Sequence, residues 1–172
     1  MKKLFVLIAL LLILTACSEQ GTGAHLMKRV SGKDSPCYLY IPLAWEDDTV
    51  DTAKRLAAHV TDEYGTATIE VTTEEQNVPD ESEEYWAYWL SDEWWADFWE
   101  DETKPTWENP SVEEYSLNNS ACQRCIYTVG DTRYTEIVSA RYHELFRLTT
   151  SEPVSSDHSA DFEEIFGAFI WN

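Results

Sequence analysis

The stretch CIYTVGDTRYTEIV, residues 125–138, decides the fold class of this 172-residue chain. Apolar and polar residues alternate on both sides of Gly130 and Asp131, as they do in strands that each bury one face. A Gly-Asp pair suits the two-residue turn that joins antiparallel neighbours. We therefore predict a β-hairpin here, as part of an antiparallel sheet.

Other segments with a period of two extend the predicted sheet. Residues 37–42, 67–71 and 144–150 alternate in the same way and are expected to be strands. Between the first two, the apolar residues of 50–60 recur at helical spacing. This spacing predicts a short helix that closes near Gly65.

The chain ends on a predicted amphipathic helix. Its large apolar side chains recur at i, i+3, i+4 and i+7, which places them on one stripe. They are Phe162, Ile165, Phe166 and Phe169. Antiparallel strands with helices at the ends are typical of α+β proteins. We therefore predict an α+β fold in which helices flank an antiparallel sheet.

The first seventeen residues, MKKLFVLIALLLILTAC, have the layout of a secretory signal: a basic start, an apolar run and small residues before Cys17. The end of this segment resembles the lipobox of bacterial lipoproteins, which are cut before a cysteine that then carries lipid. We predict a signal peptide over 1–16, a flexible tether over 17–33 and a single domain over 34–172. The mature protein would be extracytoplasmic, and the lipid on Cys17 would anchor it to the cell membrane.

The chain is strongly acidic, with a net charge of −20. Nucleic acid would repel such a chain, so we expect no nucleic-acid partner. Acids concentrate over 74–114, where Lys104 is the only basic residue. This segment is either a solvated face or a surface for a cationic partner or a weakly held divalent metal.

An internal repeat lies within the acidic, aromatic segment 80–108. Residues 82–90 (SEEYWAYWL) and 91–99 (SDEWWADFW) match in residue class except at the seventh position, where Tyr88 stands against Asp97. Each copy opens with a serine and two acids, a helix-start pattern. The segment forms either one straight helix or a helix that breaks near Ser91.

The rings of the repeat have two interpretations. They are either core residues or an exposed strip for a sugar or a partner, because exposed apolar patches mark binding sites. We expect the first copy, with Trp86, to be buried and the second to be wetter. The candidate binding residues are therefore Trp94, Trp95, Phe98 and Trp99.

One family resemblance can be stated. Residues 115–153 followed by DFEEIFGAFIW (161–171) resemble the C-terminal half of PsbP-like proteins, and CYLYIPLAW (37–45) resembles the first strand and turn of that family. The resemblance implies a PsbP-like α/β/α sandwich. It carries no activity with it, because one fold hosts many functions.

Three cysteines of the domain could form a disulfide: Cys37, Cys122 and Cys125. Outside the cytoplasm a disulfide between two of them would be compatible with the compartment. Cys122 and Cys125 would lie about 10 Å apart in an extended strand, so they could bond each other only if the strand begins after Cys122 and a turn closes the loop. One alternative is that the thiols are unpaired core residues. Another is a redox or metal site, but a redox site needs its first cysteine at the start of a helix and a zinc site needs a second pair of cysteines, and neither is visible in the sequence.

Nothing in the sequence indicates catalysis. The four histidines have no metalloprotease spacing, no nucleophile elbow or phosphate loop occurs, and no cofactor or metal set is predicted. We therefore favour a non-catalytic binding or envelope-accessory module, with a cationic protein or a glycan as partner. The alternative is a secreted, carboxylate-based glycan hydrolase or carbohydrate-binding protein that uses the tryptophans as a sugar platform.

Overall fold

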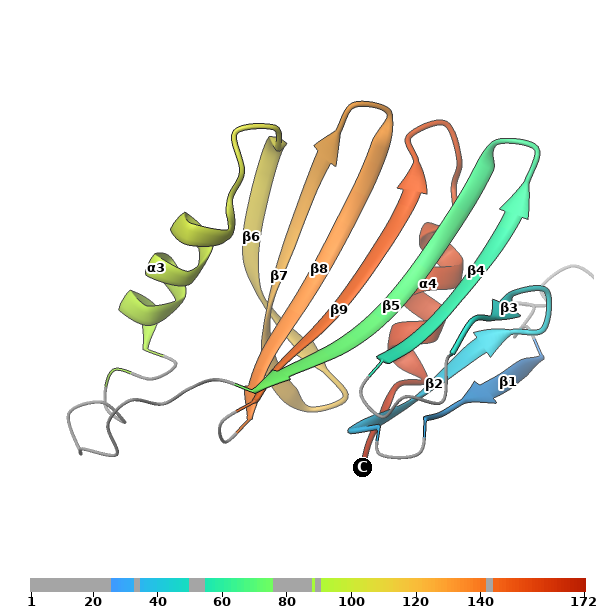
Figure 1. The fold of residues 1–172 in the computed structure, drawn as a ribbon, viewed down its shortest axis with the longest axis horizontal. Helices are drawn as coiled ribbons and strands as arrows, with labels where there is room; N and C mark the ends of the chain where they lie inside the picture. The colour runs from blue at the N-terminus through green and yellow to red at the C-terminus, as the bar shows by residue number, and fades with distance from the viewer. Residues whose placement is uncertain (1–25, 33–34, 50–54, 76–87, 89–90, 142–143) are drawn as a thin grey trace, which may run out of the picture.

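The computed structural model describes residues 26–32, 35–49, 55–75, 88, 91–141 and 144–172. In this part of the chain a seven-stranded antiparallel sheet has the strand order β3-β4-β5-β9-β8-β7-β6 (Figure 1). Its strands are β3 (Glu46–Asp47), β4 (Arg55–Asp62), β5 (Gly65–Glu75), β6 (Glu108–Leu117), β7 (Ser120–Val129), β8 (Thr132–Arg141) and β9 (Glu144–Pro153).

A smaller antiparallel sheet has the order β1-β2-β10, with β1 at Met27–Val30, β2 at Cys37–Pro42 and β10 at Ile170–Trp171. Two helices accompany the sheets in the described residues, α3 at Asp92–Glu102 and α4 at Ser159–Gly167. Figure 1 shows α3 beside β6, and α4 toward the other end of the large sheet. The α+β fold predicted from the sequence is confirmed.

The hairpin predicted over residues 125–138 is present. Strands β7 and β8 pair from Gln123 and Val138 up to Val129 and Thr132. Gly130 turns the chain with φ 58°, a conformation that a residue without Cβ adopts at no steric cost. The predicted strands over 37–42, 67–71 and 144–150 are present as parts of β2, β5 and β9.

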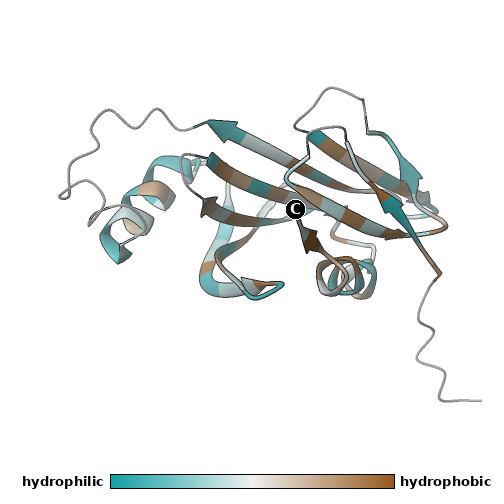
Figure 2. Ribbon diagram, turned by 90° about the horizontal axis from the view of Figure 1, so that it is seen from below, coloured by the Kyte–Doolittle hydropathy of each residue, from teal (hydrophilic) through white to brown (hydrophobic). Residues whose placement is uncertain are grey.

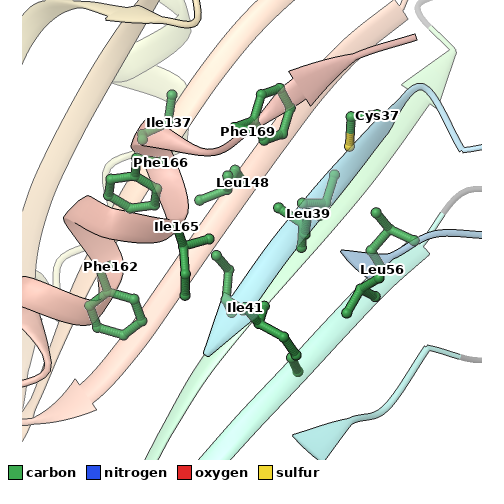
Figure 3. Close-up of a cluster of buried hydrophobic side chains, with 14 of the residues drawn as sticks. Cys37, Leu39, Ile41, Leu56, Ile137, Leu148, Phe162, Ile165, Phe166 and Phe169 are labelled. Carbon is green, nitrogen blue, oxygen red and sulfur yellow. The ribbon is translucent and has the colours of Figure 1, made fainter. Parts of the chain in front are cut away.

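The main core lies between one face of the large sheet, the strand β2 and the helix α4. The four residues of the predicted terminal stripe, Phe162, Ile165, Phe166 and Phe169, are all buried in it. Figure 3 shows them beside Leu39 and Ile41 of β2 and Ile137 and Leu148 of the large sheet. We call this side of the large sheet the α4 face.

The opposite side of the large sheet, which we call the α3 face, carries a second apolar cluster. Its buried residues on the sheet are Cys125, Tyr127, Val138 and Leu145. Because successive side chains of a strand point to opposite faces, residues of one strand divide between the two clusters. Figure 2 shows this alternation of hydrophobic and hydrophilic residues along the strands.

The helix predicted over 50–60 is wrong, because Arg55–Asp62 forms the strand β4. The apolar residues Leu56 and Ala58 also fit a period of two, and both are buried on the α4 face. Eight residue pairs join β4 to β5, from Arg55 with Thr72 to Asp62 with Gly65. Non-local pairing therefore outweighs the local helical spacing. Residues 50–54 lie outside the described part of the chain.

No helix in the described part of the chain is long and apolar enough to cross a membrane. The predicted signal peptide and Cys17 lie outside the described residues. The flexible tether predicted over 17–33 is wrong at its end, because Met27–Val30 forms the strand β1, which pairs with β2 and buries Val30 in the main core.

Candidate functional site

The helix α3 begins at the second copy of the repeat. Ser91 caps it: its backbone is extended (φ −66°, ψ 164°), and its hydroxyl accepts a hydrogen bond of 3.2 Å from the N–H of Trp94. Asp92 and Glu93 follow in the first turn, where negative charge favours the helix dipole. Because the backbone of Ser91 is extended, one straight helix through both copies is excluded, and the chain changes direction at Ser91 as the second arrangement requires. The first copy, Tyr88 excepted, lies outside the described residues.

Trp99 is buried, with 6% of its surface exposed, against Cys125, Tyr127, Val138 and Leu145 of the α3 face. The prediction that the second copy is the wetter one is therefore wrong at this position. The two acidic residues directly after Trp99 are exposed themselves but do not make Trp99 exposed. The Trp99 ring lies on the side of α3 that packs against the sheet. Its Nε1 is buried without a hydrogen-bond partner among the described residues. Trp99 is thus an anchor of α3.

The other three candidate binding residues are half-buried and contact one another. Trp94 stacks on Phe98 with ring centroids 5.4 Å apart and an interplanar angle of 20°. Trp95 meets Trp94 edge-on at 4.7 Å and Phe98 edge-on at 5.7 Å. Phe98 in turn contacts Trp99 at 5.0 Å. The four rings are therefore one cluster, with Trp99 at its buried end.

A hollow of about 480 Å³, which we call the acidic groove, lies between α3 and the strands β5 and β9. Aromatic side chains and carboxylates line it together, and Arg147 contributes its one basic group. Its lining residues are Glu74, Tyr88, Trp94, Asp97, Phe98, Asp101, Glu102, Leu145 and Arg147. The groove thus combines ring faces with an excess of negative charge.

Tyr88 and Asp97 meet at this groove. The Tyr88 hydroxyl donates a hydrogen bond of 2.5 Å to Oδ2 of Asp97, and this bond raises the pKa of Tyr88 to about 12. These two residues occupy the one position at which the two copies of the repeat differ in class. The sequence showed the difference, and the structure shows that the two residues bond to each other.

Arg147 connects the sheet to α3. Its guanidinium contacts Glu136 of β8 at 2.5 Å and Glu102 of α3 at 3.3 Å, and it lies 5.7 Å from the ring of Phe98. Burial lowers the pKa of Arg147, but the two carboxylates outweigh burial and raise it. Arg147 therefore stays charged, and its guanidinium already forms ion pairs with Glu136 and Glu102.

The network continues into a stack of three rings. The Tyr127 hydroxyl donates to Glu136 at 2.6 Å, and burial together with this bond raises the pKa of Tyr127. Trp107 stacks on one side of Tyr127 at 3.7 Å, and Tyr134 stacks at 5.2 Å. Glu136, Tyr127 and Arg147 were not predicted as site residues. The sequence signal for this network is Glu136, a charged residue that shares a core-facing side of its strand with Val138.

No disulfide joins any two of the three cysteines. Cys122 belongs to the core of the α4 face and Cys125 to that of the α3 face, so the two side chains point to opposite sides of β7. Burial raises the pKa of Cys37 to about 12 and that of Cys125 to about 11. Both thiols are therefore protonated at neutral pH, which suits a packing role.

The described histidines lie beside carboxylates away from α3. His59 of β4 contacts Asp48 at 2.5 Å, and His158 lies 3.2 Å from Asp62 and 3.3 Å from Asp161. His25 and His143 lie outside the described residues. Within the described ranges, no group of three His, Cys, Asp or Glu side chains is arranged to hold a metal ion.

No protein-family model and no curated protein sequence matches the chain. Among solved structures, the cyanobacterial PsbP of Synechocystis, CyanoP, matches with a TM-score of 0.51 and 14% identity, over 90% of this chain and 98% of CyanoP. The fold is PsbP-like. A protein of Bacteroides thetaiotaomicron matches with a TM-score of 0.49 and 11% identity, over 80% of this chain. This chain spans 45% of that protein's length.

At such identities the likeness concerns the fold alone. It confirms the fold that the family resemblance implied.

Proposed function

We propose that this protein is a membrane-tethered, extracytoplasmic binding module without catalytic activity, and that the acidic groove holds a cationic group of its partner. The observation that carries the proposal is the composition of the groove, in which Trp94 and Phe98 lie beside the carboxylates of Glu74 and Asp101. An aromatic face attracts a cation through its quadrupole, and nearby carboxylates add to that attraction.

The charges around the groove favour a cationic ligand over an anionic one. Because the guanidinium of Arg147 already forms ion pairs with Glu136 and Glu102, it would bind an anionic ligand only weakly. Glu74, Asp97 and Asp101 remain around the hollow. The net charge of −20 would also speed the approach of a basic partner at low salt.

The absence of catalysis in this proposal rests on the sequence, which has no motif for a nucleophile, a phosphate or a metal. The thiols add support, because the raised pKa values of Cys37 and Cys125 disfavour the reactive thiolate.

The tether is tested through Cys17. Globomycin, which blocks cleavage of lipoprotein signals, should make the uncut precursor accumulate. Cys17→Ser should release the protein from the membrane fraction, because lipid on this thiol is the proposed anchor. A Cys17→Ser chain that is still processed and membrane-bound would refute lipidation.

The groove is tested by isothermal titration of the full chain, in a neutral detergent, with a hexalysine peptide. Trp94→Ala and Asp101→Asn should each weaken binding several-fold. Asp131→Asn is the matched control, because it removes the same charge from the exposed β7–β8 turn outside the groove. Equal weakening by the two Asp→Asn variants would mean that only the overall charge matters, and would reject the groove.

Carbohydrate binding is the second candidate function, and one further hollow favours it. Beside the groove, Tyr134 and Arg147 line this hollow together with hydroxyl-bearing side chains of β5 and β9. The lining residues are Thr68, Glu70, Thr72, Tyr134, Arg147, Thr149 and Ser151. A half-buried ring among hydroxyls suits a sugar ring. Binding of neutral oligosaccharides that is lost in Tyr134→Ala would favour this function over the first.

A further inference from the structure

The strand β6 forms one edge of the large sheet, at the end of its strand order in the described residues. Eight of its ten residues are exposed, and only Tyr115 and Leu117 are not. An edge strand presents backbone N–H and C=O groups that no neighbouring strand uses. Figure 1 shows this edge next to α3.

The turn after β6 fixes which backbone groups point outward. Asn118 (φ 47°) and Asn119 (φ 63°) form a two-residue turn with two positive φ angles, so their flanking residues, Leu117 and Ser120, are a hydrogen-bonded pair. Hydrogen-bonded pairs recur at every second residue of an antiparallel ladder. The N–H and C=O groups of residues 112, 114 and 116 therefore point away from β7.

The two halves of β6 differ in how well they could accept another strand. Near its start, Asn109 has φ 53°, Pro110 has no N–H, and the register with β7 shifts between Glu108 and Ser111. Such irregularities block edge pairing. From Ser111 to Leu117 the strand pairs with β7 residue by residue and contains no proline or lysine. Among the described strands, this stretch is a regular edge that pairs on one side only.

Side chains around this stretch define what could pair with it. Val112 is 42% exposed and lies on the α3 face, since it pairs with Cys125. It lines a hollow together with Trp95 and Asp92 of α3. Glu114 follows on the same face and has no ion-pair partner among the described residues. The α3 side of the edge is thus apolar at one position and negative at the next.

On the other face of β6 the charge is already balanced. Glu113 contacts Arg124 at 2.6 Å, and the same guanidinium lies 4.4 Å from the ring of Tyr115. A second copy of this chain would bring a second Glu114 to the same edge, and like charges on neighbouring strands repel. The edge therefore disfavours self-pairing and favours a basic partner.

We propose that Ser111–Leu117 binds an extended segment of a partner protein by strand addition. One apolar side chain of the segment would lie beside Val112 and Trp95, and a lysine or arginine two residues away would lie beside Glu114 and Asp92. The backbone groups of residues 112, 114 and 116 supply the affinity, and the flanking side chains select the sequence. This surface lies on the other side of α3 from the acidic groove and does not depend on it.

The test uses the labelled heptapeptide Thr-Lys-Thr-Val-Thr-Lys-Thr, which reads the same in either strand direction, and the full chain in a neutral detergent. Fluorescence anisotropy gives the affinity, and hydrogen exchange by NMR follows the amides of residues 112, 114 and 116. Binding should slow exchange at these amides. Glu114→Pro removes an outward N–H but no hydrogen bond to β7, and it should weaken binding roughly tenfold or more.

Glu114→Gln is the matched variant, because it keeps the N–H and removes only the charge. It should weaken binding roughly two- to fivefold at low salt and reduce its salt dependence. Circular dichroism shows whether Glu114→Pro folds. If it does not, Ser116→Pro is used in its place, because it removes the next outward-pointing N–H.

Three results would overturn the proposal: no binding by the unaltered chain, undiminished binding by the folded proline variant, or slowed exchange outside β6. Loss of peptide binding in Asp101→Asn but not in Glu114→Pro would assign the peptide to the acidic groove instead.

Discussion

Replacing Trp99 by alanine should destabilise the protein by about 2–4 kcal/mol, because this ring anchors α3 to the sheet. A tryptophan in such a site buries about 200 Å² of ring surface, worth about 5 kcal/mol at about 25 cal/mol per Å². Alanine variants of buried tryptophans lose about 3–5 kcal/mol. The buried Nε1 of Trp99 has no partner among the described residues, and such a donor costs about 1–3 kcal/mol in the native protein. That cost disappears in the variant and lowers the expected loss.

The matched variant is Trp99→Phe, which keeps a ring in the same cluster and removes the unpartnered N–H. It should cost less than about 1 kcal/mol, because the lost ring area and the removed polar group have opposite effects. Urea unfolding followed by far-ultraviolet circular dichroism gives both free energies without relying on tryptophan emission. A loss below about 0.5 kcal/mol in Trp99→Ala would refute the anchoring role. Equal losses in the two variants would refute the argument about Nε1.

Three further predictions follow from burial and charge. Phe166→Ala should lower stability by about 3–5 kcal/mol in urea unfolding, since this ring docks α4. In the native protein Cys37, Cys122 and Cys125 should resist iodoacetamide at pH 7, and all should react after unfolding without a reductant; thiols still hidden then would indicate a disulfide. Arg55 lowers the pKa of Glu70, so their pair stabilises the protein above about pH 4.3 and ceases to do so as the pH falls through the lowered value. Glu70→Gln should therefore cost about 0.2–1 kcal/mol at pH 7, and this cost should shrink as the pH falls through the lowered pKa of Glu70.

The elements that the sequence predicted correctly are those in which local pattern and tertiary contacts agree. The hairpin around Gly130 combines strict alternation with a turn that needs a positive φ. Phe162, Ile165 and Phe166 lie on one stripe of α4 and are buried in one core, as the helical spacing predicted. Phe169 is buried in the same core but lies beyond the end of α4, so its place on the helix was predicted wrongly. The capping serine of the second repeat copy is likewise a local signal, and Ser91 forms the bond that the signal implies.

The errors occurred where distant partners decide the outcome. The residues of β4 have a helical spacing, but Leu56 and Ala58 pair with β5 and enter the core of the α4 face. The orientation of α3 depends on which side of the helix meets β7, β8 and β9, and the repeat, being aromatic on several sides, leaves that choice open. Likewise, Arg147 and Glu136 lie far apart from Glu102 in sequence. Only the register of β8 with β9, and the docking of α3, bring the three together.

The acidity of the chain and its concentration of tryptophan are best understood together. A helix with four large rings in two turns would aggregate if its outer side were apolar as well, because exposed apolar patches associate. On α3 the outer positions carry Asp97, Glu100 and Asp101, which are exposed. On β6 Glu114 likewise disfavours pairing with a second copy. Under the proposed function, the same carboxylates that disfavour association of identical chains would attract a basic partner, so one distribution of charge would serve both purposes.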